Sequence, residues 1–372
     1  MRVGVPREVK VREYRVGLVP AGVREVVAAG GSVVVEAGAG AGVGIDDAEF
    51  EAAGARIAPD ADAVFAESDL IVKVKEPQLE ECRRLRPHHT LFAFLHLAAD
   101  PAQARALCAS GATAIAFETV TAPDGSLPLL TPMSEVAGRM SVQVGAHCLE
   151  KENGGRGVLL GGVPGVEPAR VVVLGGGVAG TNAAEMAIGL GAHVTVVDLS
   201  LARLRALAAR FGARISTARS SRETVDALVR GADLAIGSVL VPGAAAPKLV
   251  SRETVAAMPA GAVVVDIAID QGGCFATSRP TTHDAPTFVE HGVVHYCVTN
   301  MPGAVPRTST FALANATLPY VLKLVESGTE GAVAADGGLA AGVNVRAGAV
   351  VHPVVAKALA AQSAASGVTR AA

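Results

Sequence analysis

Short apolar runs alternate with alanine-rich stretches through the first third of the chain. We expect strands in the runs at 3–6, 32–36, 69–75, 90–96 and 113–118, which are rich in valine, isoleucine, leucine and phenylalanine. The stretches between them, such as 20–29 and 101–110, have the composition of helices. This regular alternation of strand and helix predicts an α/β domain with a mostly parallel sheet.

A second alternation covers the middle of the chain. We expect strands at 170–174, 193–198, 233–238, 262–270 and 293–299, which are enough for a doubly wound sheet. A longer helix precedes them, with Ser134 as its expected N-cap and Gly154 and Gly155 as its stop. Its apolar face comprises Val136, Met140, Val144 and Cys148. This helix is expected to connect two domains.

The chain after Pro306 predicts another helix that ends at Gly328. Its expected buried stripe comprises Phe311, Ala314, Leu318, Val321, Leu322 and Val325. Because no strands remain to extend the second sheet, we expect this tail to pack on the first domain. The prediction is two Rossmann-like domains, with 131–304 inserted into a discontinuous domain of 1–130 plus 305–372 and a functional cleft between them. Beyond Glu330 we expect irregular structure plus one short helix.

Composition supports a two-domain globular protein and excludes several classes. The chain has 372 residues, of which 50% are hydrophobic and 18% charged, and its net charge of −3 is spread without a basic patch for nucleic acid. Five scattered cysteines show no metal-ligand spacing and are typical of free thiols in a reducing compartment. The charged N-terminus and the lack of a spanning apolar run predict a cytoplasmic protein that does not enter a membrane.

The stretch 171–180 combines an apolar strand with glycines spaced as in dinucleotide-binding turns. Gly175 suits the tight turn, Gly177 allows close approach of a phosphate, and Gly180 allows close packing of helix and strand. Asp198 ends the next strand, where its carboxylate can bind the adenosine ribose hydroxyls and repel a 2′-phosphate. The pattern predicts an NAD site, and the alternative is a glycine-rich turn without a ligand.

Three side chains in the first domain, two at expected strand ends and one in the loop 12–15, suggest chemistry on a small carbonyl or amine. His96 can exchange a proton with a substrate oxygen, although a lone histidine is also a common packing residue. Lys75 offers a point charge and Arg15 a planar fork for a carboxylate. Both are equally compatible with solvated surface charges.

A fourth candidate lies in the second domain. Asp266 and Asp270 are expected on one face of the strand 262–270, and Asp270 precedes a Gln-Gly-Gly turn. A carboxylate there can stabilise an iminium or activate the water that hydrolyses it. The alternative is an aspartate that caps its own glycine turn.

Seven segments together resemble the family that contains alanine dehydrogenase and the nucleotide-binding α subunit of proton-pumping transhydrogenase. They are RVGVPRE (2–8), EYRV (13–16), KVKEP (73–77), LHLA (95–98), PMSEVAGR (132–139), DIAIDQGG (266–273) and NMPGAVPRT (300–308). The resemblance extends from residue 2 to about residue 325, so the last 40 or so residues carry no recognisable motif.

The resemblance implies reversible oxidative deamination of L-alanine by NAD to pyruvate and ammonium, in a homohexamer. It makes His96 the general acid and base, Asp270 the second catalytic group, and Arg15 and Lys75 the substrate-binding residues. It also implies a set of residues that line the NAD site: Ser134, Gly175, Gly177, Val178, Ala179, Gly180, Asp198, Arg203, Ser220, Val239, Leu240, Ile267, Asn300 and Met301.

Two positions depart from the family pattern. Phe117 stands where many relatives have tyrosine, and Arg203 stands where lysine is common. Because arginine pairs well with a 2′-phosphate, Arg203 leaves room for some use of NADP. The rival functions are the hydride-exchanging subunit of transhydrogenase, an opine dehydrogenase of the lysine branch, and an NAD-binding sensor without catalysis.

Overall fold

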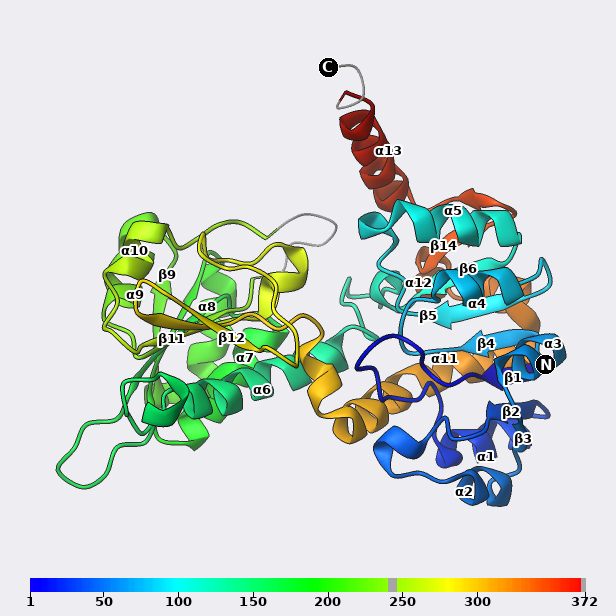
Figure 1. Ribbon diagram of the computed structural model, residues 1–372, viewed down its shortest axis with the longest axis horizontal. Helices are drawn as coiled ribbons and strands as arrows, with labels where there is room; N and C mark the ends of the chain where they lie inside the picture. The colour runs from blue at the N-terminus through cyan, green and yellow to red at the C-terminus, as the bar shows by residue number, and fades with distance from the viewer. Residues whose placement is uncertain (240–245, 369–372) are drawn as a thin grey trace. The chain divides into compact units, whose positions relative to one another are not determined.

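The structure is a computed structural model that describes residues 1–239 and 246–368, with side chains up to residue 362. The chain divides into two compact units, Met1–Met133 with Val305–Ala372 (unit 1) and Ser134–Ala304 (unit 2) (Figure 1). Each unit contains a mostly parallel sheet with helices, which confirms the predicted α/β class. Within the described ranges, every helix is too short or too polar to cross a bilayer.

Unit 1 contains an eight-stranded sheet in the order β15-β14-β6-β5-β4-β1-β2-β3. The strands from β6 to β3 are parallel, whereas β14 runs antiparallel to β6 and β15 antiparallel to β14. The strands are β1 (Arg2–Val5), β2 (Ser32–Glu36), β3 (Arg56–Ala58), β4 (Leu70–Val72), β5 (Thr90–Ala93), β6 (Thr113–Ala116), β14 (Val343–Arg346) and β15 (Ala349–Val350).

Three helices of unit 1 begin at an aspartate that caps them. Asp46, Asp60 and Asp100 accept backbone N–H groups at the first turns of α2, α3 and α5, which satisfies donors that a helix start leaves open. The helices are α1 (Pro20–Ala28), α2 (Asp47–Ala52), α3 (Ala61–Glu67), α4 (Leu79–Arg84), α5 (Pro101–Ser110), α11 (Pro306–Ala335), α12 (Gly337–Ala341) and α13 (Pro353–Val368).

Unit 2 contains a seven-stranded sheet in the order β12-β13-β11-β10-β7-β8-β9, in which only the pairing of β12 with β13 is antiparallel. Its strands are β7 (Arg170–Leu174), β8 (His193–Asp198), β9 (Ile215–Arg219), β10 (Leu234–Gly237), β11 (Val263–Asp266), β12 (Thr287–Glu290) and β13 (Val293–Tyr296). Its helices are α7 (Val178–Gly189), α8 (Leu201–Phe211), α9 (Arg222–Arg230) and α10 (Arg252–Ala256), and α6 (Thr131–Cys148) begins at the end of unit 1.

Both sheets wind outward in two directions from their first strand. In unit 1 the chain goes from β1 to β2 and β3 on one side, and then to β4, β5 and β6 on the other. In unit 2 it goes from β7 to β8 and β9 on one side, and then to β10 and β11 on the other. The reversal lies between β1 and β4 in unit 1 and between β7 and β10 in unit 2. In open parallel sheets, ligands bind outside the carboxyl ends of the strands at this point of reversal.

The predicted strand 262–270 is wrong in its second half. Strand β11 ends at Asp266, and a 3₁₀ helix, η6 (Ile267–Gln271), follows it. The physical reason is that the Asp266 carboxylate accepts the N–H groups of Ala268 (3.2 Å) and Cys274 (2.8 Å), which bends the chain back over the strand end. Asp266 and Asp270 therefore do not share a strand face.

Three predictions about helices and the tail need correction. Helix α6 begins at Thr131, so Ser134 lies in its first turn and is not its N-cap. The buried stripe of α11 includes Leu313, Thr317 and Leu324, whereas Phe311 is 37% exposed. Gly328 does interrupt the helix, with φ +67°. The tail beyond Glu330 forms β14, β15, α12 and α13, and β14 extends the sheet of unit 1 beside β6.

Strand β14 offers a test of the sheet that the tail completes. Val345 is fully buried and pairs with Ala114. We expect Val345→Ala to lower the free energy of unfolding by about 2 kcal/mol, because it removes two buried methyl groups and leaves a cavity. Val351, which is about half exposed, provides the control, and Val351→Ala is expected to change stability by less than about 0.5 kcal/mol. Urea denaturation measures both, and equal effects would contradict the placement of β14.

Candidate functional site

A buried ion cluster lies at the carboxyl ends of β1 and β4 in unit 1. The Lys73 ammonium contacts the carboxylates of Glu8 (3.1 Å) and Glu81 (2.6 Å), and all three side chains are buried. Burial by itself lowers the pKa of Lys73, but the two carboxylates outweigh it and raise that pKa above its ordinary value. Burial raises the pKa of Glu8, and the charge of Lys73 opposes that shift.

Glu8 also fixes the backbone that leads to Lys75. Its Oε1 atom accepts the N–H groups of Val74 (2.7 Å) and Lys75 (3.4 Å). The Lys75 side chain is buried, with 8% of the residue exposed. Burial alone raises the pKa of the neighbouring Glu76, but the charges of Lys75, Lys10 and His96 outweigh it, so that pKa lies below its ordinary value. Lys75 is therefore not the solvated surface charge of the alternative interpretation.

Arg15 is buried and held by its own loop. The Glu13 carboxylate binds it in a bidentate pair, with Nε to Oε1 at 2.6 Å and Nη2 to Oε2 at 2.5 Å, and Nη1 contacts the Met133 sulfur at 3.0 Å. The loop passes close to the end of β4, because a Cβ atom at Gly17 would lie 2.5 Å from the carbonyl oxygen of Val72. Such a rigid, fork-shaped cation suits a planar carboxylate ligand.

His96 follows β5 in an unusual backbone conformation. Its φ is +49°, in the left-handed region, and its side chain is exposed. The Glu118 carboxylate accepts the N–H groups of Leu95 (3.2 Å) and His96 (2.6 Å). The imidazole stacks on Phe94, with ring centroids 5.8 Å apart and planes 4° apart, and Phe117 contacts Phe94 edge-on. Phe117 is thus a packing residue behind the stacked ring.

The glycine turn of unit 2 has the conformation that its spacing predicts. Gly175 has φ +98°, and a Cβ atom at Gly180 would lie 1.8 Å from the Gly175 carbonyl oxygen, so both positions require glycine. At Gly177 a Cβ atom would meet nothing within 4 Å. Gly177 is the N-cap of α7 and, as a glycine, has no side chain to cap the first amides of the helix.

Asp198 is fixed beside this turn at the end of β8. Its Oδ2 accepts the Gly176 N–H (2.7 Å) and its Oδ1 the Ser200 N–H (2.8 Å). The Arg203 stem lies close by, because a Cβ atom at Gly176 would be 3.1 Å from Arg203 Cγ and 3.3 Å from Asp198 Oδ2. The Ser220 N–H donates to the Asp198 carbonyl oxygen.

The other cofactor candidates also lie at or after strand ends. Val239 follows β10 against the turn, because a Cβ atom at Gly175 would lie 2.9 Å from its Cγ2. Ile267 follows β11, and Asn300 and Met301 follow β13. Val178 and Ala179 open α7, and Ser134 lies in the first turn of α6. Leu240 lies outside the described residues.

Asp270 is exposed in η6, whereas Asp266 is fully buried at the end of β11. Asp266 accepts the Cys274 N–H (2.8 Å) and the Ser278 hydroxyl (2.7 Å), and burial raises its pKa. Asp266 is therefore the aspartate that caps the glycine turn. The capping role considered for Asp270 belongs to its neighbour four residues earlier.

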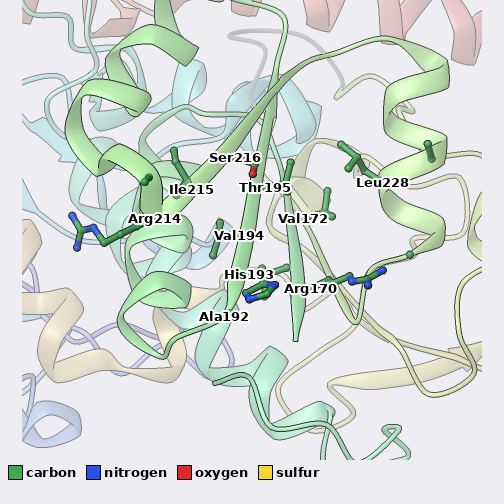
Figure 2. Close-up of a pocket in the computed structure, with 14 residues that line it drawn as sticks. Arg170, Val172, Ala192, His193, Val194, Thr195, Arg214, Ile215, Ser216 and Leu228 are labelled. Carbon is green, nitrogen blue, oxygen red and sulfur yellow. The ribbon is translucent and has the colours of Figure 1, made fainter. Parts of the chain in front are cut away.

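A groove of about 420 Å³ lies at the amino ends of β7, β8 and β9 in the unit 2 sheet, opposite the glycine turn (Figure 2). It is lined by Arg170, His193 and Ile215, the first residues of β7, β8 and β9. The glycine turn and Asp198 lie at the carboxyl ends of the same strands. Because bound nucleotides occupy the carboxyl ends, this groove is not the candidate cofactor site.

Comparisons with known proteins agree with this architecture. Residues 4–137 match the family model described as alanine dehydrogenase/PNT, N-terminal domain, and residues 141–353 match that of the C-terminal domain. Alanine dehydrogenases of Halomonas elongata and Mycolicibacterium smegmatis are each 58% identical to this chain, over 96% of both chains. A solved L-alanine dehydrogenase has a TM-score of 0.94 at 51% identity, covering 97% of this chain and 99% of its own. A transhydrogenase from Sinorhizobium meliloti has a TM-score of 0.81 at 27% identity, covering 95% of this chain and 99% of its own.

These matches place the protein among the oxidoreductases of an NAD-binding family. The chain belongs to the alanine dehydrogenase/PNT family, which confirms the resemblance seen in its motifs. Its identity to the alanine dehydrogenases is about twice its identity to the solved transhydrogenase.

Sequence reasoning missed the carboxylates that hold the candidate residues in place. These carboxylates belong to Glu8, Glu13 and Glu118, which bind the Val74 N–H, the Arg15 guanidinium and the His96 N–H respectively. No local sequence pattern distinguishes any of them from a surface glutamate. A partial signal existed for Glu8 and Glu13, because both lie in the segments that carry the family resemblance. Lys73 lies in such a segment as well, but nothing in the sequence indicates that it is buried.

The ion cluster around Lys73 gives a test of this part of the site. We expect Lys73→Met to lower the free energy of unfolding by about 3–5 kcal/mol, because it leaves two buried carboxylates without their cation. The matched control is Lys323→Met, which removes an exposed pair with Asp336 and should cost no more than about 1 kcal/mol. Chemical denaturation of both variants measures the difference. A cost for Lys73→Met no larger than that of the control would show that the cluster is not buried.

Proposed function

We propose that the protein is an L-alanine dehydrogenase that interconverts L-alanine and pyruvate with NAD. The observation that carries the proposal is the set of Arg15, Lys75 and His96 around the carboxyl ends of the unit 1 strands, in a chain 58% identical to alanine dehydrogenases. Arg15 and Lys75 are both buried, and a cation shielded from water attracts an anionic group more strongly than an exposed one. The hydride-exchanging transhydrogenase subunit has no organic substrate for such cations to bind.

Substrate binding is assigned to Arg15 and Lys75. Glu13 binds the Nε–Nη2 edge of Arg15 and fixes the plane of the guanidinium, to which we assign the substrate carboxylate. Lys75 donates to the oxygen of the substrate carbonyl or to the carboxylate. The bidentate pair with Glu13 fixes the orientation of the guanidinium before the substrate arrives, which reduces the cost of ordering it on binding.

Proton transfer is assigned to His96 and Asp270. The imidazole of His96 accepts a proton from the substrate during oxidation and returns it in the reverse direction. Asp270 stabilises the positive charge of the imine and orients the water that hydrolyses it. Both side chains are exposed, so protons reach them from solvent.

The residues of unit 2 fit NAD. The first amides of α7 and the space at Gly177 suit a pyrophosphate, and the anchored Asp198 carboxylate suits the ribose hydroxyls. The bound nicotinamide supplies the hydride acceptor for the substrate Cα. Around it we assign Ser134, Arg203, Ser220, Val239, Leu240, Ile267, Asn300 and Met301 to the cofactor site.

We also propose a homohexamer, as the family resemblance implies. Leu159, Val163 and Val166 on the loop before β7 are each more than half exposed, and an apolar loop of this kind is typical of surfaces that pack against another subunit.

All five cysteines are free thiols, which is consistent with a reducing compartment.

The proposal predicts alanine-dependent formation of NADH, followed at 340 nm with the purified protein at alkaline pH. His96→Ala is expected to lower kcat by about 10²–10⁴-fold, because it removes the proton carrier. NADP in place of NAD is expected to give a much lower kcat/KM, because Asp198 repels a 2′-phosphate. His88→Ala serves as the control histidine of unit 1. Binding of NAD without turnover of alanine or any other amino acid would contradict the proposal and favour the transhydrogenase-like or sensor function.

A further inference from the structure

The backbone at His96 lies in the left-handed region, which few residues other than glycine occupy. A left-handed φ of +49° places Cβ close to the following carbonyl group, which is why this region favours glycine and asparagine. Such a residue costs on the order of 1 kcal/mol and persists only where surrounding groups fix it. Non-glycine residues of this kind cluster at functional sites.

The group that fixes it is the Glu118 carboxylate. Both of its oxygens lie 3.2 Å from the Leu95 nitrogen, and Oε1 lies 2.6 Å from the His96 nitrogen. Two successive N–H groups beside a left-handed residue form a small concave site that attracts an anion. Glu118 fills that site with an internal carboxylate, so the imidazole projects from a fixed backbone.

Glu118 itself is anchored by the C-terminal part of the chain. It lies in the 3₁₀ helix η3 (Phe117–Thr119), directly after β6. Asn344 on β14 donates to the Thr119 hydroxyl at 2.7 Å, and its side chain also donates to the carbonyl oxygen of Gly342 at 2.9 Å. Asn344 is buried, so this connection is shielded from water. Strand β14 therefore fixes the 3₁₀ helix that carries Glu118.

We propose that Glu118 is a positioning residue for the dehydrogenase reaction: it holds the His96 backbone left-handed, so that the imidazole meets the substrate oxygen. This inference rests on the proposed role of His96. It also gives the C-terminal strand β14 a function, since that strand anchors η3. Glu118 acts through the backbone of His96 and not through contact with the reacting atoms.

The test compares Glu118→Gln with Glu118→Asp and the control Asp60→Asn. The amide of the first variant retains one oxygen acceptor but directs an NH₂ group at the backbone donors, whereas the shorter carboxylate of the second variant retains the charge. Asp60 also accepts a backbone N–H in unit 1, at the start of α3. The readouts are kcat and KM for alanine, and hydrogen exchange of the peptide that contains Leu95 and His96 in the intact protein.

We expect Glu118→Gln to accelerate exchange of that peptide and to lower kcat by about 10- to 100-fold, because small misplacement of a catalytic group is costly. KM should change by less than about threefold, because Arg15 and Lys75 bind the substrate. Glu118→Asp should restore part of kcat, and Asp60→Asn should leave kcat and this exchange unchanged.

Unchanged exchange, unchanged kcat, or a loss confined to KM would each overturn the role of Glu118. Equal effects of Asp60→Asn on kcat would overturn it as well, by showing a general loss of stability. A fully active His96→Ala variant would instead contradict the proposed function. The hydrogen-exchange measurement separates the two failures, because it reports the contact with the backbone whether or not His96 is catalytic.

Discussion

Carboxylates at the carboxyl ends of strands bind backbone N–H groups of the loop that follows a neighbouring strand, and the sites depend on this interaction. Glu8 binds the loop after β4, Glu118 the loop after β5, and Asp198 the turn after β7. Charged acceptors form the stronger backbone hydrogen bonds, and each removes donors that would otherwise lie unpaired in a loop. The loops are thereby fixed in the conformations that present Lys75, His96 and the glycine turn.

The same interaction explains how charge is distributed in unit 1. The Glu8 carboxylate forms an ion pair with Lys73 and also accepts the backbone N–H groups of Val74 and Lys75. One carboxylate therefore holds both a buried cation and the backbone of a candidate substrate-binding cation. Glu13 has the corresponding relation to Arg15. Because Glu13 fixes the orientation of the Arg15 guanidinium, binding of the proposed anionic substrate there would carry a low entropic cost.

Local patterns in the sequence predicted most of the parallel strands, the glycine turn and the acid that ends β8, because each depends on residues close together in the chain. The contacts of the Glu8, Glu118 and Asp198 carboxylates with backbone N–H groups were not predictable, since they join residues 22 to 67 positions apart. Strand ends were also misplaced where a side chain bends the backbone, as Asp266 does after β11. The alanine- and glycine-rich tail gave no signal for β14, whose pairing with β6 is decided by the packed sheet.

The most direct measurement is a crystal structure of the protein with NADH and pyruvate. We expect the pyruvate carboxylate within hydrogen-bond distance of the Arg15 guanidinium, with Lys75 and His96 at the pyruvate carbonyl oxygen. We also expect the pyrophosphate at the first amides of α7. Pyruvate bound away from Arg15 and Lys75, or a nucleotide in the groove at the amino ends of β7, β8 and β9, would contradict it.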